Sequence, residues 1–173
     1  MNLKKHHSQI VAAFILLVVF IFYVVSNEGE GTLRIVSLAA GNGKAIFIQV
    51  PDGNRILIDA GSDASILRAL GGVMPFYDRS LDLVIVTDTS QSSIGGMPEV
   101  LNNYSVKRYV SVDGLGGGSA YRETQKEIAD KKIQMDLVRP GSAISLGDGL
   151  SLLIEAEGIF LSDGKNTEKI EAK

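Results

Sequence analysis

The chain has 173 residues and a formal net charge of −3, so it lacks the overall basic surface that many nucleic-acid-binding proteins use. It contains no cysteine, which excludes disulfides, thiolate nucleophiles and cysteine-ligated zinc. Hydrophobic residues make up 45% of the chain, which is enough to build a packed core.

The chain begins with a cationic stretch, 1–7, followed by an uncharged segment, 8–26. Its apolar run, 10–25, approaches the about 20 residues that cross a bilayer core. Because positive charges precede this run and Glu28 follows it, the positive-inside rule predicts a cytoplasmic N-terminus. We expect a single-pass transmembrane helix at 8–26 in the cell membrane, with the main domain extracytoplasmic. A signal peptide cleaved before Asn27 is the alternative.

After the segment 8–26, the sequence predicts a linker, 27–32, one α/β domain, 33–161, and a polar tail, 162–173. Alternating or continuous apolar residues predict strands, and a period near 3.6 predicts helices. In chain order these elements are strands 33–38, 44–50 and 55–59, a helix after Asp63, strand 81–87, helix 98–103, strand 107–112, helix 120–132, strand 133–138, and a hairpin of 143–146 with 150–156. This order predicts a mixed sheet with hairpins and packed helices.

Two familiar kinds of site, a phosphate-binding loop and a serine nucleophile, are excluded because residues that they require are missing. The segment "GNGKA", 41–45, has Ala after Lys44 where a phosphate loop needs Ser or Thr, and a strand follows it instead of a helix. A serine nucleophile needs a histidine to take its proton, but His6 and His7 both precede the predicted transmembrane helix.

A polar loop, "TDTSQSSIGG" at 87–96, follows the apolar strand 81–87. Loops in this position present catalytic groups in many α/β enzymes. Here Asp88 is the single carboxylate among threonine, serine and glutamine residues.

The segment 33–156 resembles the metallo-β-lactamase fold, and specifically the ComEC-type competence domain linked to DNA internalisation. The likeness is carried by "LAAGNGKAIFIQVPDGNRILIDAG" at 38–61 and "LRALGGVMPFYDRSLDLVIVTD" at 67–88. The family has a Gly-x-Gly turn, a Pro-Asp-Gly hairpin and an Ile-Asp ending at the same places. The resemblance implies a partial αβ/βα sandwich, because the chain ends before the second half of the family's domain.

In that family the loop after the strand has the pattern Thr-His-Pro-Asp-x-Asp-His-x-Gly-Gly and supplies metal ligands. The resemblance places degenerate ligand positions at Asp88, Ser90, Ser92 and Ser93. The residues that keep the frame of the site are Gly41, Gly43, Lys44, Asp59, Thr87, Gly95 and Gly96. Lys44 replaces an aspartate of the family, and we expect its ammonium to face Asp59 or Asp88.

Hydroxyl groups are poor substitutes for imidazole and carboxylate, and zinc needs about three or four such donors. We therefore expect no catalytic residue, no metal site and no cofactor; zinc or manganese would bind only if the family activity were retained. The function expected is a non-catalytic domain for binding or assembly, with a protein partner or a second copy, and with DNA by family analogy alone. The alternatives are a metal-dependent hydrolase or nuclease related to competence DNA uptake, and a non-functional gene fragment.

Overall fold

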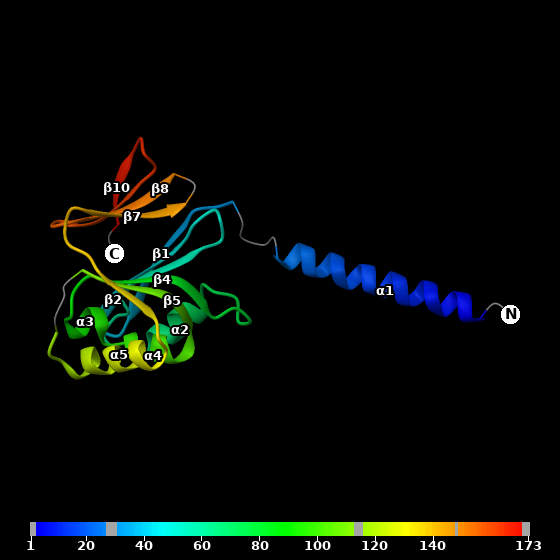
Figure 1. The fold of residues 1–173 in the computed structure, drawn as a ribbon, viewed down its shortest axis with the longest axis horizontal. Helices are drawn as coiled ribbons and strands as arrows, with labels where there is room; N and C mark the ends of the chain where they lie inside the picture. The colour runs from blue at the N-terminus through cyan, green and yellow to red at the C-terminus, as the bar shows by residue number, and fades with distance from the viewer. Residues whose placement is uncertain (1–2, 27–30, 113–115, 148, 171–173) are drawn as a thin grey trace. The chain divides into compact units, whose positions relative to one another are not determined.

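The computed structural model describes residues 3–26, 31–112, 116–147 and 149–170 (Figure 1). Contacts divide the chain into two units, Met1–Glu30 and Gly31–Lys173. All the described core residues lie in the second unit. Residues 27–30 of the expected linker lie outside the described part of the chain.

The first unit contains helix α1, Leu3–Ser26. Within the described residues, no helix combines the length and the apolar character that crossing a membrane requires. The prediction of a transmembrane helix at 8–26 is therefore wrong, and the predicted cell-membrane and extracytoplasmic placement, which depended on it, is wrong with it. The reason is length: at 1.5 Å per residue the apolar run 10–25 spans about 24 Å, short of a hydrocarbon core of about 30 Å.

A six-stranded sheet forms the centre of the second unit, and its spatial order follows the chain order. Its strands are β1 (Arg34–Ala40), β2 (Gly43–Gln49), β3 (Arg55–Ile58), β4 (Ser80–Val86), β5 (Ser105–Ser111) and β6 (Gln134–Leu137). The first three strands are antiparallel neighbours, and β3 to β6 are parallel. The predicted mixed sheet is confirmed.

Helices cover one face of this sheet (Figure 1). They are α2 (Ile66–Gly71), α3 (Gln91–Ile94), α4 (Met97–Asn103) and α5 (Ser119–Asp130). Leu70 and Leu101 from the helices are buried in one cluster with Phe47, Leu57 and Tyr109 from the strands. Each such side chain contributes roughly 1.5–3 kcal/mol on burial, so this layer fixes how the helices lie on the sheet.

A second, four-stranded antiparallel sheet covers the opposite face (Figure 1). Its strands are β7 (Ser142–Gly147), β8 (Leu150–Glu155), β9 (Gly158–Ser162) and β10 (Thr167–Ile170). Leu152 and Ile154 from β8 are buried in one cluster with Ile48, Ile56 and Ile85 from the central sheet. The domain is thus a layer of helices, a six-stranded sheet and a four-stranded sheet.

Candidate functional site

The candidate site lies where β3 and β4 end. The two strands are parallel neighbours, so the residues that follow them, Asp59 and Thr87, come together. The Thr87 backbone N–H donates to Asp59 Oδ1 at 2.8 Å, and Thr87 Oγ1 donates to Asp59 Oδ2 at 2.7 Å. Both carboxylate oxygens of Asp59 are therefore engaged by one neighbouring residue.

Asp59 occupies a turn conformation with a positive φ of 58°, which aspartate and asparagine tolerate better than most residues. Burial raises the pKa of its carboxyl group to about 6, against the opposing effect of the hydrogen bonds from Thr87. Lys44, Asp59 and Asp88 line one hollow, and the expectation that the Lys44 ammonium faces Asp59 or Asp88 stays a prediction.

Asp88 is held by the serines that follow it. The Ser90 backbone N–H donates to Asp88 Oδ1 at 2.6 Å, and the Ser93 hydroxyl donates to Oδ2 at 2.9 Å. Partial burial raises the pKa of Asp88, but these hydrogen bonds outweigh it and the pKa lies below its usual range. The Ser90 and Ser92 hydroxyl oxygens are 2.9 Å apart, so the four degenerate ligand positions bond to one another.

The glycines of the predicted frame are required by close backbone packing. A Cβ on Gly43 would lie 2.0 Å from the Ser92 carbonyl oxygen, and one on Gly95 would lie 2.2 Å from the Ser62 carbonyl oxygen. A Cβ on Gly96 would meet the Ala60 carbonyl oxygen at 2.4 Å. These contacts pack the loop 87–96 closely against its neighbours.

The last predicted frame glycine, Gly41, has a φ of +63°, where glycine is favoured. It follows β1, and the Ser62 backbone N–H donates to the Ala40 carbonyl oxygen beside it. The frame residues identified from the sequence therefore do meet at one edge of the sheet.

A hollow of about 460 Å³ opens over these strand ends. One side is polar, with Lys44, Asp59, Asp88, Ser92 and Ser93 in its lining. Apolar residues of the second sheet, Ile159 and Ile170, contribute the other side. The sequence predicted no strand at β9 or β10, so this side of the hollow was missed; the alternation in "GIFLS", 158–162, was the available signal.

The glycine-rich segment 114–119 also reaches the loop. Its residues 114 and 115 lie outside the described part of the chain, but Gly116 is described. A Cβ on Gly116 would lie 2.7 Å from Thr89 Cβ and 2.8 Å from the ring of Tyr121. Gly116 therefore packs against the loop of the candidate site, which the sequence did not predict.

Solved structures with a similar arrangement are metallo-β-lactamase-fold proteins. One is a HARLDQ-motif mutant of a metallo-β-lactamase from Cronobacter sakazakii, with a TM-score of 0.53 and 16% identity over 77% of this chain and 57% of that one. Another is Zn²⁺-bound PqqB from Methylobacterium extorquens, with a TM-score of 0.52 and 13% identity; the match covers 78% of this chain and 60% of PqqB. A third is YhfI from Bacillus subtilis, with a TM-score of 0.50 and 16% identity; the match covers 78% of this chain and 59% of YhfI.

The chain has a metallo-β-lactamase fold. It spans 57–60% of the length of these three structures. No protein-family model and no curated protein sequence matches it. At these identities the likeness establishes the fold alone, and the ComEC-type subfamily stays a prediction from the sequence.

The side chains of this metallo-β-lactamase-fold site do not fit a zinc centre. Zinc takes three or four donors from histidine, cysteine and carboxylate side chains. Among the described residues, no group of three or more His, Cys, Asp or Glu side chains is placed to hold a metal. The two carboxylates in the hollow, Asp59 and Asp88, already accept the hydrogen bonds described above.

Proposed function

We propose that this metallo-β-lactamase-fold domain has lost the metal ligands of its fold, is non-catalytic, and serves binding or assembly. The observation that carries the proposal is the hydrogen-bond network of the loop 87–96. Asp88 accepts from Ser90 and Ser93 at the positions where the resembled family has metal ligands.

This network would have to be broken before a metal could bind. Ser93 is only 9% exposed, and its hydroxyl donates to Asp88. Removing that donor would leave a partly buried carboxylate less well satisfied, which is unfavourable. The serine hydroxyls are neutral, so they would return little binding energy to a divalent cation.

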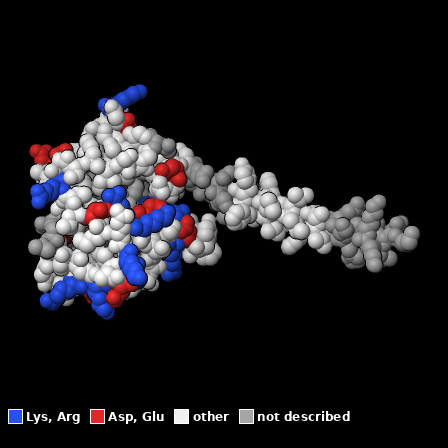
Figure 2. All heavy atoms as spheres, in the orientation of Figure 1, with Lys and Arg blue, Asp and Glu red and all other residues white. Residues whose placement is uncertain are grey.

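A role in competence or DNA uptake has the sequence resemblance as its only support. On the face of the second unit drawn in Figure 2, basic and acidic side chains are interspersed. The net charge of −3 likewise supplies no general attraction for DNA. We therefore propose a protein, or a second copy of the chain, as the more suitable partner.

Metal content tests the proposal. The chain is loaded with zinc or manganese, desalted and analysed for bound metal, in a background where His6→Gln and His7→Gln remove an adjacent histidine pair that can hold metal by itself. The matched control combines Asp88→His, Ser90→Asp, Ser92→Asp and Ser93→His, which restores the family's donor types on the same backbone.

We expect the unaltered loop to retain well below one metal per chain and the restored loop to retain about one. Near-stoichiometric metal on the unaltered loop would contradict the proposal. It would favour a metal-dependent hydrolase that uses Asp59 and Asp88.

A further inference from the structure

Strand β1 forms one edge of the six-stranded sheet. It pairs with β2 on one side, and none of the described strands pairs with its other side. Its seven residues, 34–40, pair with β2 without a register shift, so the strand is regular along its whole length. An edge strand of this kind presents backbone N–H and C=O groups that can pair with a further strand.

The other sheet edges in the described part of the chain are shorter, charged or irregular. Strand β6 has four residues and contains Asp136, and β10 has four residues and contains Glu168 and Lys169. Strand β7 has a register shift in its pairing with β8. Short length, charges and bulges protect a sheet edge against pairing with another chain. Strand β1 has none of these features beyond its first residue, Arg34.

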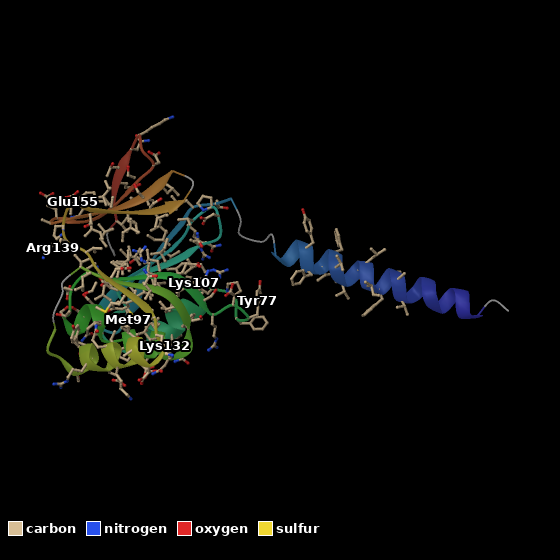
Figure 3. The ribbon with its side chains drawn as sticks, viewed as in Figure 1. Tyr77, Met97, Lys107, Lys132, Arg139 and Glu155 are labelled. Atoms are coloured by element: carbon tan, nitrogen blue, oxygen red, sulfur yellow. The ribbon has the colours of Figure 1, made fainter. Side chains whose placement is uncertain are left out.

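Exposed apolar side chains mark the start of β1. Among the described residues of the second unit, the large apolar side chains that are exposed are Leu33 and Ile35 at the start of β1, Phe76 and Tyr77 on the loop between α2 and β4, and Leu137 at the end of β6. The Arg34 guanidinium donates to the Val73 carbonyl oxygen at 3.1 Å, which ties the loop between α2 and β4 to the start of β1. Tyr77 lies at the outer side of this loop (Figure 3). A long, regular edge strand with exposed apolar residues favours association with another strand.

The pairing with β2 decides which residues of β1 face the open edge. The β1–β2 hairpin has a two-residue turn, and the first turn residue, Gly41, has a φ of +63°. In such a hairpin the two residues that flank the turn exchange both backbone hydrogen bonds. Alternation along the strand then directs the backbone groups of Ile35, Ser37 and Ala39 toward the open edge. The side chains of these three residues are also exposed.

A second copy of β1 matches this edge about a two-fold axis. In an antiparallel pair with full overlap, Ser37 lies opposite Ser37 of the other copy, and Ile35 lies opposite Ala39. The bulky half of each strand thus faces the small half of the other. Arg34 lies opposite Ala40, so like charges do not face each other. We infer that two copies of this chain associate edge to edge through antiparallel β1 strands centred on Ser37, which joins their six-stranded sheets.

Backbone hydrogen bonds supply the affinity of such a strand addition, and the side chains set its register. One strand edge is a narrow contact compared with the about 800 Å² per partner of a stable interface. The association is therefore reversible and depends on protein concentration. It names a partner for the assembly role proposed above and rests on that proposal for its purpose alone. Metal retention by the loop 87–96 and pairing through β1 are separate measurements, so either can fail without the other.

The absence of native cysteine allows the pairing to be trapped on the full chain. Ser37→Cys places two thiols opposite each other at a Cα separation of about 5.5 Å, which a disulfide spans. Ala39→Cys is the matched control, because it lies on the same face of the same strand. In this register the two copies of residue 39 are offset by four residues, about 14 Å, which no disulfide spans. Each variant is incubated with oxidised glutathione, and the rate of covalent dimer formation is measured.

We expect Ser37→Cys to form the covalent dimer at least tenfold faster than Ala39→Cys, because the pairing holds its two thiols together. Association through another part of the chain would not favour position 37 over position 39. Equal rates, or a faster rate for Ala39→Cys, would overturn the inference.

A charge test checks the two-fold axis without a covalent bond. Ser37→Lys and Ser37→Glu each place like charges opposite one another, so each variant should associate about tenfold more weakly than the natural chain in sedimentation experiments. An equimolar mixture of the two variants brings opposite charges together and should recover the association. A mixture that associates no better than either variant alone, or a natural chain that associates no better than the variants, would overturn the inference.

Discussion

Strand β4 has an aspartate just beyond each of its ends, and the two are held differently. Asp78, before the strand, accepts from the backbone and hydroxyl of Ser80 and pairs with the Arg55 guanidinium. Asp88, after the strand, accepts from the Ser90 backbone and from the Ser93 hydroxyl. A permanent cation stabilises the first carboxylate, whereas these donors to the second are neutral.

The two loops therefore differ in what stabilises their aspartate and in what they present to their surroundings. At the first end, the ion pair fixes a loop that presents aromatic side chains outward. At the second end, where the metal loop of the resembled family would lie, the glycine backbone frame is kept while serines satisfy the aspartate. This contrast is what the proposal of a retained site geometry without its donors leads one to expect, and the following predictions test that proposal.

The largest effect is expected at the glycine frame. Gly43→Ala forces a Cβ against the Ser92 carbonyl oxygen and the Gly61 backbone, so it should lower the free energy of unfolding by about 3 kcal/mol. Urea denaturation followed by circular dichroism measures this. Gly117→Ala is the control, because no heavy atom lies within 4 Å of the added methyl. A Gly43→Ala variant as stable as this control would show that the loop is not packed as described.

The next effect concerns Asp59 and depends on pH. Because burial raises its pKa to about 6, the folded state holds a proton between about pH 4 and pH 6 that the unfolded state has released. The stability of the natural chain therefore falls as the pH rises through this window. Asp59→Asn removes the unfavourable burial of an ionised carboxylate. Asparagine tolerates the same backbone conformation, and its side-chain amide can donate to the Thr87 hydroxyl.

We expect Asp59→Asn to be more stable than the natural chain by about 2 kcal/mol at pH 7, with little difference at pH 4. Denaturation curves across this range give the difference. If the two proteins differed by the same amount at every pH, the buried carboxylate would not be the cause.

A somewhat smaller effect is expected at the ion pair below the aromatic loop. Arg55→Met leaves the Asp78 carboxylate without its cation and should lower the free energy of unfolding by about 1–2 kcal/mol, since Asp78 is partly exposed. A double-mutant cycle with Asp78→Asn isolates the pair. Strictly additive single effects would show that the two groups do not interact.

The smallest effect is expected at Asp88→Asn, about 0.5–1 kcal/mol at pH 7, because asparagine can keep one acceptor and donate to Ser93. The pKa of Asp88 is lowered, so its contribution is present above the usual aspartate pKa and is lost as the pH falls below it. Stability measured at pH 7 and at pH 3 checks both the size and the sign. A loss larger than that of Arg55→Met would reverse the comparison between the two ends of β4.

Much of the fold was predictable because alternating or continuous apolar residues mark the strands β1 to β8 and a period near 3.6 residues marks helices such as α2. Helix α3 was missed because its four residues give no apolar period. Strand β10, Thr167–Ile170, was missed because all but Ile170 are polar and exposed. The apolar run in α1 matches a membrane span in composition but not in length, so composition alone predicts a span there.

At the site, the glycines and Asp59 were predictable because their pattern along the chain survives. The hydrogen bonds among Asp88, Ser90, Ser92 and Ser93 were not, because they depend on loop dihedral angles that single residue types do not fix. The outward orientation of Phe76 and Tyr77 was likewise hidden, since aromatic residues in a sequence are more often found inside.

Thermal unfolding with and without zinc tests the central claim most directly, that the backbone frame remains while the donors are gone. A ligand that binds the folded state stabilises it by about 2.7 kcal/mol at a hundredfold excess over its Kd, which raises Tm by several degrees. We predict no zinc-dependent shift for the chain that carries His6→Gln and His7→Gln with its natural loop. We predict a clear rise when Asp88→His, Ser90→Asp, Ser92→Asp and Ser93→His are added to that background. An equal rise with the natural loop would contradict the account.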